Sequence, residues 1–498
     1  MKKGFVYLVG AGPGDPELIT VKALRALEEA DVIVYDFLAN SILLDKYSCE
    51  KIYVGKSGSN HTLTQDEINQ LIIDKALEGK TVTRLKGGDP FIFGRGGEEA
   101  EELVDAGIAF AVVPGISSFY SAPAYAGIPV THRDHANALE VITGHRRADG
   151  SDDDDVNFPE YDSDRTYAFL MGMKNLGHIT ASLIETKNFP PDTPVGIITW
   201  GTRPQQRVAT GTLKTIVKEV EKAGLTPPAI ILVGTVVTLR EKLRWFDNMP
   251  LFGKRIVVTR TRKQASKISQ KLMRLGAEVI EFPTIEIVPE KDMSGLVRAL
   301  DKADAYDWLV LTSQNAVEIF FDELLKSGQD VRALGNLKVA VIGPATGNEL
   351  INYGLIPDIV PEKYVAEGLL AAFDDCDLKN KKILLPCSAE ARPVLAEGLA
   401  ARGAEVDRIH IYGTALPEGK TEEEIEMVGN ADYITFASSS TVSNFFKIIP
   451  DVKAKIASIG PVTSAKVKEL GFDVAIEAEE YTIDGIVEAV IADCVKPL

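Results

Sequence analysis

The segment FVYLVGAGPGDPELITVKALRALEEADVIVY (Phe5–Tyr35) contains two strand-like runs separated by a helical pattern. The runs FVYLV (Phe5–Val9) and VIVY (Val32–Tyr35) are short and apolar, as is typical of buried strands. Between them, apolar residues recur at helical spacing from Leu18 to Leu27. Because a strand, helix, strand order produces parallel strands, this segment predicts a parallel α/β sheet.

The same alternation continues to about residue 234, with further strand-like runs at KTVTRL (Lys80–Leu85), FAVVPG (Phe110–Gly115), LEVITG (Leu139–Gly144), TYAFLMG (Thr166–Gly172), VGIITWGT (Val195–Thr202) and AIILVG (Ala229–Gly234). The alternation of strand-like and helical runs begins again at GKRIVVTR, which starts at Gly253. A chain of 498 residues is also too long for one domain of ordinary size. We therefore expect one domain over residues 1–246 and another over 251–498.

From Gly253 onward the chain repeats itself. DWLVLTSQNAVEIFF (Asp307–Phe321) parallels DYITFASSSTVSNFF (Asp432–Phe446), and LKVAVIGPATGNELINYG (Leu337–Gly354) parallels AKIASIGPVTSAKVKELG (Ala454–Gly471). Two similar α/β lobes are the simplest explanation of this repeat.

Two segments of the repeat alternate like extended strands, FPTIEIV (Phe282–Val288) and RIHIYGTA (Arg408–Ala415). If they lie side by side, they carry the chain from one lobe to the other and back. Lobe one then comprises 251–286 and 416–498, and lobe two comprises 287–415. Bilobed α/β proteins with such a two-strand hinge bind their ligand between the lobes.

Composition and charge exclude several classes of protein. Lys and Arg number 54 against 72 Asp and Glu, and the resulting net charge of −18 repels nucleic acid and anionic membranes. No apolar run reaches the ~18 residues of a membrane span, and glycines appear too early for a secretory signal, so we expect a cytoplasmic protein. The 4 cysteines show no CxxC spacing, so neither a disulfide framework nor a metal site is expected.

The glycine-rich turn GAGPGD (Gly10–Asp15) follows the first strand. It is not the dinucleotide pattern GxGxxG, and Pro13 lacks the N–H that a pyrophosphate would use, so a structural turn and a cofactor site are equally consistent with it. RLKGGDPFIFGRGGEE (Arg84–Glu99) is more specific, because its glycines and Asp89 follow a strand end, where open α/β sheets bind ligands. PGISSFYSAPAYAGIPVTHR (Pro114–Arg133) is a second such segment.

Together these motifs make the chain from Phe5 to about Phe246 resemble the tetrapyrrole methylase family, and within it uroporphyrinogen-III C-methyltransferase. ADVIVYD, VGK, TGH, LMG and PPAIILVG also match, in the same order. The resemblance implies a two-lobed α/β fold that binds S-adenosyl-L-methionine between its lobes, usually as a homodimer. The cofactor contacts that it implies are Pro13, Gly87, Gly88, Asp89, Ile92, Ser117, Ser118, Met171 and Gly201.

The resemblance also implies an acid–base pair, Asp36 and Lys56. From the residues alone, a strand-end aspartate is as often a helix cap, and a loop lysine is as often solvated. The substrate of that family carries eight carboxylates, and cations gather near the ends of the motifs; as substrate contacts we expect Arg84, Arg95 and Arg133.

The chain from Leu251 to Leu498 resembles uroporphyrinogen-III synthase, through GKRIVVTR, the paired IGP segments and the IYGT around Tyr412. This resemblance implies cyclisation of hydroxymethylbilane with inversion of the last ring and loss of water. Tyr412 matches a hinge tyrosine that could donate the proton, although a packed aromatic explains it equally well. Further expected substrate contacts are Arg260, Ser313, Ser438 and Ser439, and helix capping is the alternative for each serine.

The two resemblances together imply a bifunctional enzyme. Its C-terminal half makes uroporphyrinogen III, and its N-terminal half methylates that product at C2 and C7 to give precorrin-2 for cobalamin or sirohaem synthesis. The alternative is a methyltransferase that acts on a later corrin intermediate, fused to a non-catalytic two-lobed sensor.

Overall fold

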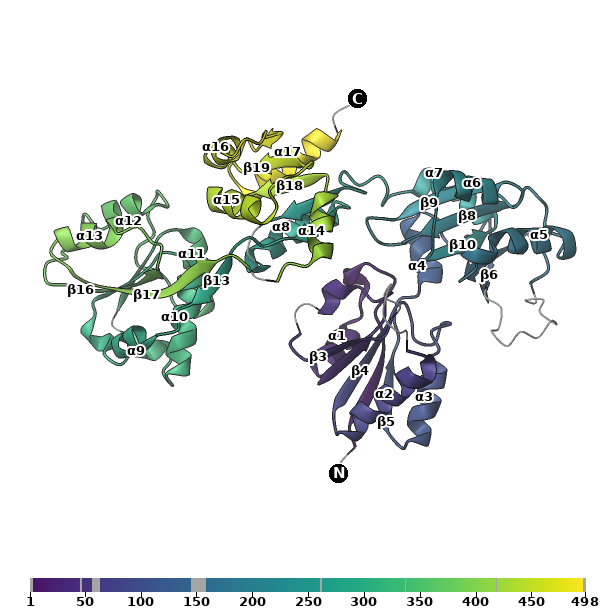
Figure 1. Cartoon of the computed structure of the whole chain (residues 1–498), viewed down its shortest axis with the longest axis horizontal. Coiled ribbons are helices and arrows are strands. Elements are labelled where there is room, and N and C mark those ends of the chain that lie inside the picture. Colours follow the sequence, from purple (N-terminus) through teal and green to yellow (C-terminus); the bar gives the residue numbers. More distant parts are fainter. Residues whose placement is uncertain are drawn as a thin grey trace. The chain divides into compact units, whose positions relative to one another are not determined.

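The computed structural model describes residues 3–44, 47–55, 63–144, 158–259, 262–335, 337–417 and 419–495. It contains two compact units whose boundary lies close to Arg255. Each unit holds two five-stranded sheets with helices against them (Figure 1), so the α/β class predicted from the sequence is confirmed.

The first sheet is wholly parallel. Its strands, in spatial order, are β3 (Glu50–Tyr53), β2 (Val32–Tyr35), β4 (Thr81–Lys86), β1 (Phe5–Gly10) and β5 (Ala109–Val113). Its helices are α1 (Val21–Glu28), α2 (Gln65–Leu77) and α3 (Gly96–Asp105).

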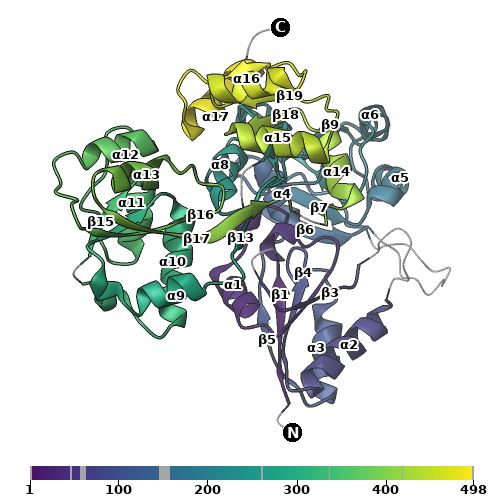
Figure 2. The same cartoon turned by 60° about the vertical axis from the view of Figure 1, so that its left-hand side comes forward.

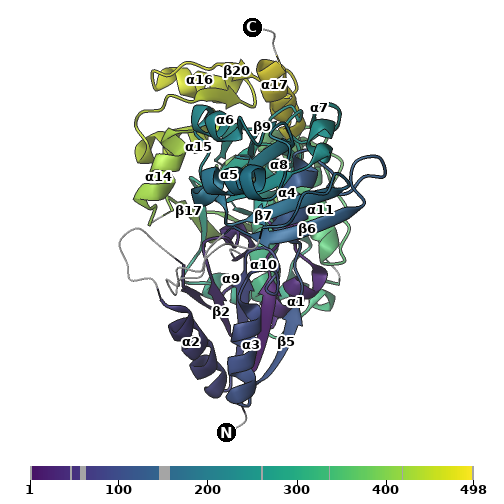
Figure 3. The ribbon, with the colours of Figure 1, turned by 90° about the vertical axis from the view of Figure 1, so that its right-hand side faces the viewer.

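Successive side chains along the strands of this sheet pack against helices on opposite faces. On β1, Val6 and Leu8 face the cluster that contains α2 and α3, whereas Val9 faces the cluster that contains α1. Side chains of successive strand residues point to opposite faces, so a strand that is apolar throughout must be covered on both sides. Figure 3 shows α2 and α3 side by side on one of these faces.

The second sheet is mixed. Its order is β6 (Ala138–Thr143), β7 (Arg165–Leu170), β10 (Ala229–Val233), β8 (Pro194–Thr199) and β9 (Arg207–Thr212). Only β6 and β7 are parallel, and the other neighbours are antiparallel, which departs from the parallel arrangement predicted for this stretch. The short connection from β8 to β9 has no crossover helix, and such a connection can join only antiparallel neighbours. The helices around this sheet are α4 (Ser118–Tyr125), α5 (Leu176–Thr186), α6 (Ile216–Ala223) and α7 (Arg240–Leu243).

The chain beyond the boundary contains the third and fourth sheets. The third comprises β12 (Glu278–Glu281), β11 (Arg255–Val258), β18 (Tyr433–Phe436), β19 (Lys455–Ser458) and β20 (Ile476–Glu477). The fourth comprises β13 (Glu286–Pro289), β17 (Glu405–Ala415), β16 (Lys382–Ser388), β14 (Trp308–Leu311) and β15 (Lys338–Val341). The accompanying helices are α8 (Arg262–Arg274), α9 (Ser294–Leu300), α10 (Gln314–Lys326), α11 (Pro344–Asn352), α12 (Ala366–Ala372), α13 (Val394–Ala401), α14 (Glu422–Gly429), α15 (Ser439–Ile448), α16 (Pro461–Glu469) and α17 (Ile483–Val495).

Strand β13 pairs antiparallel with the end of the long strand β17, from Glu286 opposite Ala415 to Pro289 opposite Tyr412. Figure 2 shows the two strands side by side. The two segments that the sequence singled out as extended therefore do run together, although their action as a hinge stays a prediction.

In the ranges that the structure describes, no helix has the length and apolar character needed to cross a bilayer. Over the same ranges, no group of three or more His, Cys, Asp or Glu side chains is arranged to hold a metal ion.

The core of the third sheet gives a test of this packing. Phe445 of α15 is fully buried, and its ring centroid lies 5.3 Å from that of Phe436 and 5.8 Å from that of Phe282. We expect Phe445→Ala to lower the free energy of unfolding of this lobe by about 3–5 kcal/mol, because truncation leaves a cavity. Hydrogen exchange of β18 and β19, followed by mass spectrometry, measures the loss. Val462→Ala, at a position 76% exposed, is the control, and equal protection in the two variants would contradict the assignment.

Candidate functional site

A cavity of about 620 Å³ lies between the first and second sheets of the N-terminal unit. Its walls come from the loops that follow β1, β2, β4 and β5 on one side, and from the ends of β7, β8 and β10 on the other. The carboxyl ends of parallel strands meet at one edge of a sheet, which is where open α/β sheets bind their ligands. The volume lies within the range of small-molecule and cofactor sites.

Three glycines bring the strand-end loops of the first sheet into backbone contact. A Cβ on Gly115 would lie 2.1 Å from the carbonyl oxygen of Gly88 and 2.7 Å from the Cα of Gly10. A Cβ on Gly10 would meet the same oxygen at 2.5 Å. No other residue fits at Gly10 or Gly115 without moving a backbone, and Gly88 has a left-handed φ of 69°, which favours glycine there for a different reason.

Asp89 ties two of these loops together. One carboxylate oxygen accepts from the backbone N–H of Phe91 at 2.8 Å, and the other accepts from the N–H of Gly115 at 2.9 Å. The carboxylate keeps unused lone pairs, because each oxygen can accept more than one hydrogen bond. Asp89 can therefore hold the loops in place and still accept from a bound ligand.

Strained backbone concentrates at this cavity. Four of the seven non-glycine residues with left-handed φ in the described chain line it, namely Phe93 (51°), Arg95 (58°), Met171 (57°) and Trp200 (49°). Such conformations cost free energy and persist only where the surroundings impose them, which is typical of ligand sites.

All nine positions expected to contact the cofactor line this one cavity: Pro13, Gly87, Gly88, Asp89, Ile92, Ser117, Ser118, Met171 and Gly201. The residues present fit S-adenosyl-L-methionine. Glycine backbone and a carboxylate offer partners for its polar groups, Ile92 and Met171 offer apolar contact, and a Cβ on Gly88 would point into otherwise open space. Whether each position touches the cofactor stays a prediction.

Three hydrogen bonds hold the two walls of the cavity together. The backbone N–H of Asp15 donates to Oγ1 of Thr202 at 3.0 Å, and the hydroxyl of Tyr125 donates to Oδ2 of Asp15 at 2.6 Å. Burial and the hydrogen bond to Asp15 raise the pKa of Tyr125 well above its usual value. Arg203 adds a bond from its guanidinium to the carbonyl oxygen of Leu38 at 3.3 Å.

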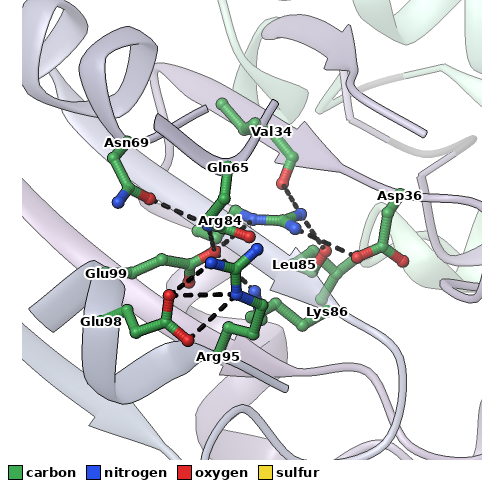
Figure 4. Close-up of polar contacts among 10 residues, drawn as sticks. All are labelled: Val34, Asp36, Gln65, Asn69, Arg84, Leu85, Lys86, Arg95, Glu98 and Glu99. Carbon is green, nitrogen blue, oxygen red and sulfur yellow. Dashed lines mark hydrogen bonds and ion pairs between the residues drawn. The ribbon is translucent and has the colours of Figure 1, made fainter. Parts of the chain in front are cut away.

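Asp36 follows β2 and faces the cavity, where a buried guanidinium holds it (Figure 4). Nη2 of Arg84 lies 3.1 Å from Oδ2 of Asp36, and Nε of Arg84 lies 3.3 Å from Oε1 of Glu99. The same guanidinium donates to the carbonyl oxygens of Val34 and Leu85. With 3% of its surface exposed, Arg84 directs its donors at the protein, and these contacts favour a role in holding Asp36 over one in binding substrate.

Lys86 extends this cluster, since its Nζ lies 2.5 Å from Oε1 of Glu99. Burial, and then the positive charge of Arg84, lower the pKa of Lys86. The sequence places Lys86 among the cations near the motif ends, whereas Glu99 is not among the residues expected at the site. Its spacing could have identified Glu99. Leu103 lies four residues later on α3 and belongs to the core, and residues four apart share a helix face, so Glu99 is expected to face the protein interior.

The other residues expected in this half lie at different places. Arg95 lines the cavity and pairs with Glu98 at 2.5 Å, with 53% of its side chain exposed. Arg133 is exposed and is not among the lining residues. Lys56 lies outside the described residues.

In the C-terminal half, Tyr412 lies on β17 and is buried among the core of the fourth sheet. Its hydroxyl is 2.9 Å from Oγ of Ser313, which in turn accepts from the N–H of Ala316 and caps α10. Burial raises the pKa of Tyr412 above the ordinary value of a tyrosine. The Tyr412 hydroxyl is thereby tied to a helix N-terminus.

Ser438 caps α15 in the same way, by accepting from the N–H of Thr441 at 3.3 Å, and Ser439 is the first residue of that helix. These contacts agree with the capping alternative for Ser313 and Ser438. Carboxylate binding by the three serines stays a prediction, and Arg260 lies outside the described residues.

Comparison with known proteins matches two families to the two halves. Residues 6–217 match the tetrapyrrole (corrin/porphyrin) methylases, and residues 266–488 match uroporphyrinogen-III synthase HemD. The chain is 39% identical to a porphyrin biosynthesis protein HemD of Ruminiclostridium josui, over 99% of this chain and 98% of that protein. It is 42% identical to a uroporphyrinogen-III C-methyltransferase of Bacillus subtilis (strain 168), over 73% of this chain and 74% of that one.

Among solved structures, the chain is similar to a uroporphyrin-III C-methyltransferase of Thermus thermophilus in complex with S-adenosyl homocysteine. The identity is 37% and the TM-score 0.41, and the match covers 47% of this chain and 100% of that one.

Asp89 gives the sharpest test of the site. We expect Asp89→Ala to weaken binding of S-adenosylhomocysteine about 10-fold or more, because the change leaves the N–H of Gly115 without its partner and removes an acceptor, each typically worth ~1–3 kcal/mol. Calorimetric titration of the whole chain measures the dissociation constant. Asp105→Ala, on the exposed end of α3, is the matched control. Equal affinity in the two variants would rule out a role for Asp89 in binding the cofactor.

Proposed function

Because the chain belongs to the tetrapyrrole methylase family in its N-terminal half and to the uroporphyrinogen-III synthase family in its C-terminal half, we propose that it converts hydroxymethylbilane to precorrin-2. The C-terminal half cyclises hydroxymethylbilane to uroporphyrinogen III, and the N-terminal half methylates that product at C2 and C7. The observation that carries the proposal is the single cavity that brings the nine cofactor positions together with Asp36. A homodimer formed through the methyltransferase half, and a cytoplasmic location, belong to the same proposal.

Methyl transfer requires positioning and one proton acceptor. S-adenosyl-L-methionine, when bound, supplies an electrophilic methyl group on its sulfonium sulfur. The glycine loops and Asp89 hold the cofactor in one orientation, and positioning of this kind accounts for much of the rate of a transfer reaction. The pyrrole carbon that accepts the methyl group must lose a proton as the ring rearranges, and Asp36, held open to the cavity by Arg84, is the base.

The substrate's carboxylates need cations that lie at the cavity wall. Arg95, Lys174 and Arg203 line the cavity, and Lys174 is exposed. We assign these three cations to the substrate, in place of the buried Arg84. Charge-assisted hydrogen bonds to carboxylates are about twice as strong as neutral ones, so a few such cations can capture a polyanion on a chain of net charge −18.

Cyclisation of hydroxymethylbilane needs a donor to assist the departing hydroxide. A tyrosine is protonated at neutral pH, and burial raises the pKa of Tyr412 further. The contact with Oγ of Ser313, at 2.9 Å, holds the hydroxyl group in place. The tyrosine can give its proton to the leaving group and regain one from solvent when product leaves.

The decisive experiment is anaerobic incubation of the whole chain with hydroxymethylbilane, with and without S-adenosylmethionine. We expect uroporphyrinogen III without the cofactor and a dimethylated product of precorrin-2 mass with it. Uroporphyrinogen I as the sole product without cofactor would instead assign the C-terminal half to the sensor alternative. Failure to methylate supplied uroporphyrinogen III would refute the proposed methyltransferase activity.

The role of Tyr412 has its own test. We expect Tyr412→Phe to slow cyclisation about 10-fold or more and to raise the fraction of uroporphyrinogen I, which forms when the chain closes without ring inversion. Methylation of supplied uroporphyrinogen III stays normal. Isomer analysis by chromatography measures the effect. Tyr306→Phe is the matched control, since it removes another hydroxyl of the same lobe, one that donates to Asp407 at 2.6 Å. A wild-type rate and isomer ratio in Tyr412→Phe would assign the tyrosine to packing alone.

A further inference from the structure

Glu99 is a buried carboxylate on which three side chains converge. It belongs to the first turn of α3, and its side chain is 1% exposed. One of its oxygens, Oε1, receives Nζ of Lys86 at 2.5 Å, Nε2 of Gln65 at 3.1 Å and Nε of Arg84 at 3.3 Å. The other, Oε2, is buried with no hydrogen-bond partner among the described residues. Figure 4 shows the convergence on Glu99 and the link from Arg84 to Asp36.

This arrangement is poorly suited to a purely structural role. Burial of ions costs several kcal/mol each, and replacement of such groups by apolar side chains of similar volume is often neutral or stabilising. A buried carboxylate oxygen without a partner adds a further cost. Arg84 and Lys86 belong to β4, and both line the cavity. A functional role at the cavity therefore explains these buried charges better than a contribution to the stability of the fold.

We propose that Glu99 is a positioning residue for proton transfer in the methyltransferase half. Its carboxylate holds Arg84 and Lys86 at the wall of the cavity, and Arg84 in turn holds the carboxylate of Asp36 toward the substrate. The inference rests on the proposed methyltransferase function and deepens it. Glu99 does not line the cavity, so it acts on Asp36 through Arg84.

The charges explain why the carboxylate is needed. Asp36 and Glu99 together balance Arg84 and Lys86. The other titratable groups that interact with this cluster are Arg95 with Glu99, Glu98 with Lys86, and Tyr53 of β3 with Asp36. Without the charge of Glu99, two buried cations would act on Asp36 alone. Added positive charge favours the ionised form of a carboxylate, which makes it a weaker base and moves its titration to lower pH.

The test is the pH dependence of methyl transfer to supplied uroporphyrinogen III by the whole chain. We expect Glu99→Gln to lower kcat about 10-fold or more and to move the acidic limb of the profile by about one pH unit toward lower pH. The affinity for S-adenosylhomocysteine stays within about two-fold, because Glu99 does not line the cavity. Glu99→Asp, which keeps the charge, should restore the position of the limb. Glu102→Gln, at an exposed position of the same helix, is the control.

A second variant keeps the inference testable if Glu99→Gln does not fold. Lys86→Met removes a positive charge from the same cluster and should move the acidic limb toward higher pH. A lower kcat in Glu99→Gln with an unmoved acidic limb would assign Glu99 a structural role only and overturn the inference. A shift of the acidic limb toward lower pH in Lys86→Met would overturn it as well. If the wild-type chain does not methylate uroporphyrinogen III, the proposed function itself fails, which is a separate outcome.

Discussion

The methyltransferase cavity depends on three strand-end loops that meet in backbone contact. Gly10, Gly88 and Gly115 come from different motifs, and a Cβ on Gly115 would lie 2.1 Å from the oxygen of Gly88. The strands that carry them are neighbours in the order β4, β1, β5, so their carboxyl ends reach the same edge of the sheet. Asp89 then joins two of the loops through backbone N–H groups. Residues that are distant in the sequence, and that are expected to contact the cofactor, line one cavity because this contact brings the three loops together.

The cations that line this cavity fall into two groups. Arg84 and Lys86 are buried and paired with carboxylates, and we propose that they position Asp36, the proposed base. Lys174 and Arg203 lie on the cavity wall, where they can meet an anionic substrate. A chain with a net charge of −18 would otherwise repel a polycarboxylate, and local cations overcome that field at short range.

The two halves differ in how much of the site could be predicted from sequence. In the methyltransferase half, close backbone contacts favour glycine and two backbone N–H groups bind Asp89. Such residues lie close together in the chain, so they form motifs that can be recognised in the sequence. In the synthase half, Ser313 and Ser438 are expected both as helix caps and as carboxylate contacts, and a motif cannot separate these roles, because both use the same hydroxyl at the same helix N-terminus. The structure shows the capping bonds and ties the hydroxyl of Tyr412 to Ser313.

The sequence by itself determined the α/β class, the internal repeat of the C-terminal half and the positions of the glycine loops, because periodicity and turn chemistry are local properties of the chain. Only the tertiary structure decided the antiparallel strands of the second sheet and the partners of the buried charges. Asp36, Arg84 and Glu99 are separated by 48 and 15 positions in the chain. Their pairing arises where β2, β4 and α3 pack together, and no local pattern records which carboxylate a buried guanidinium will meet.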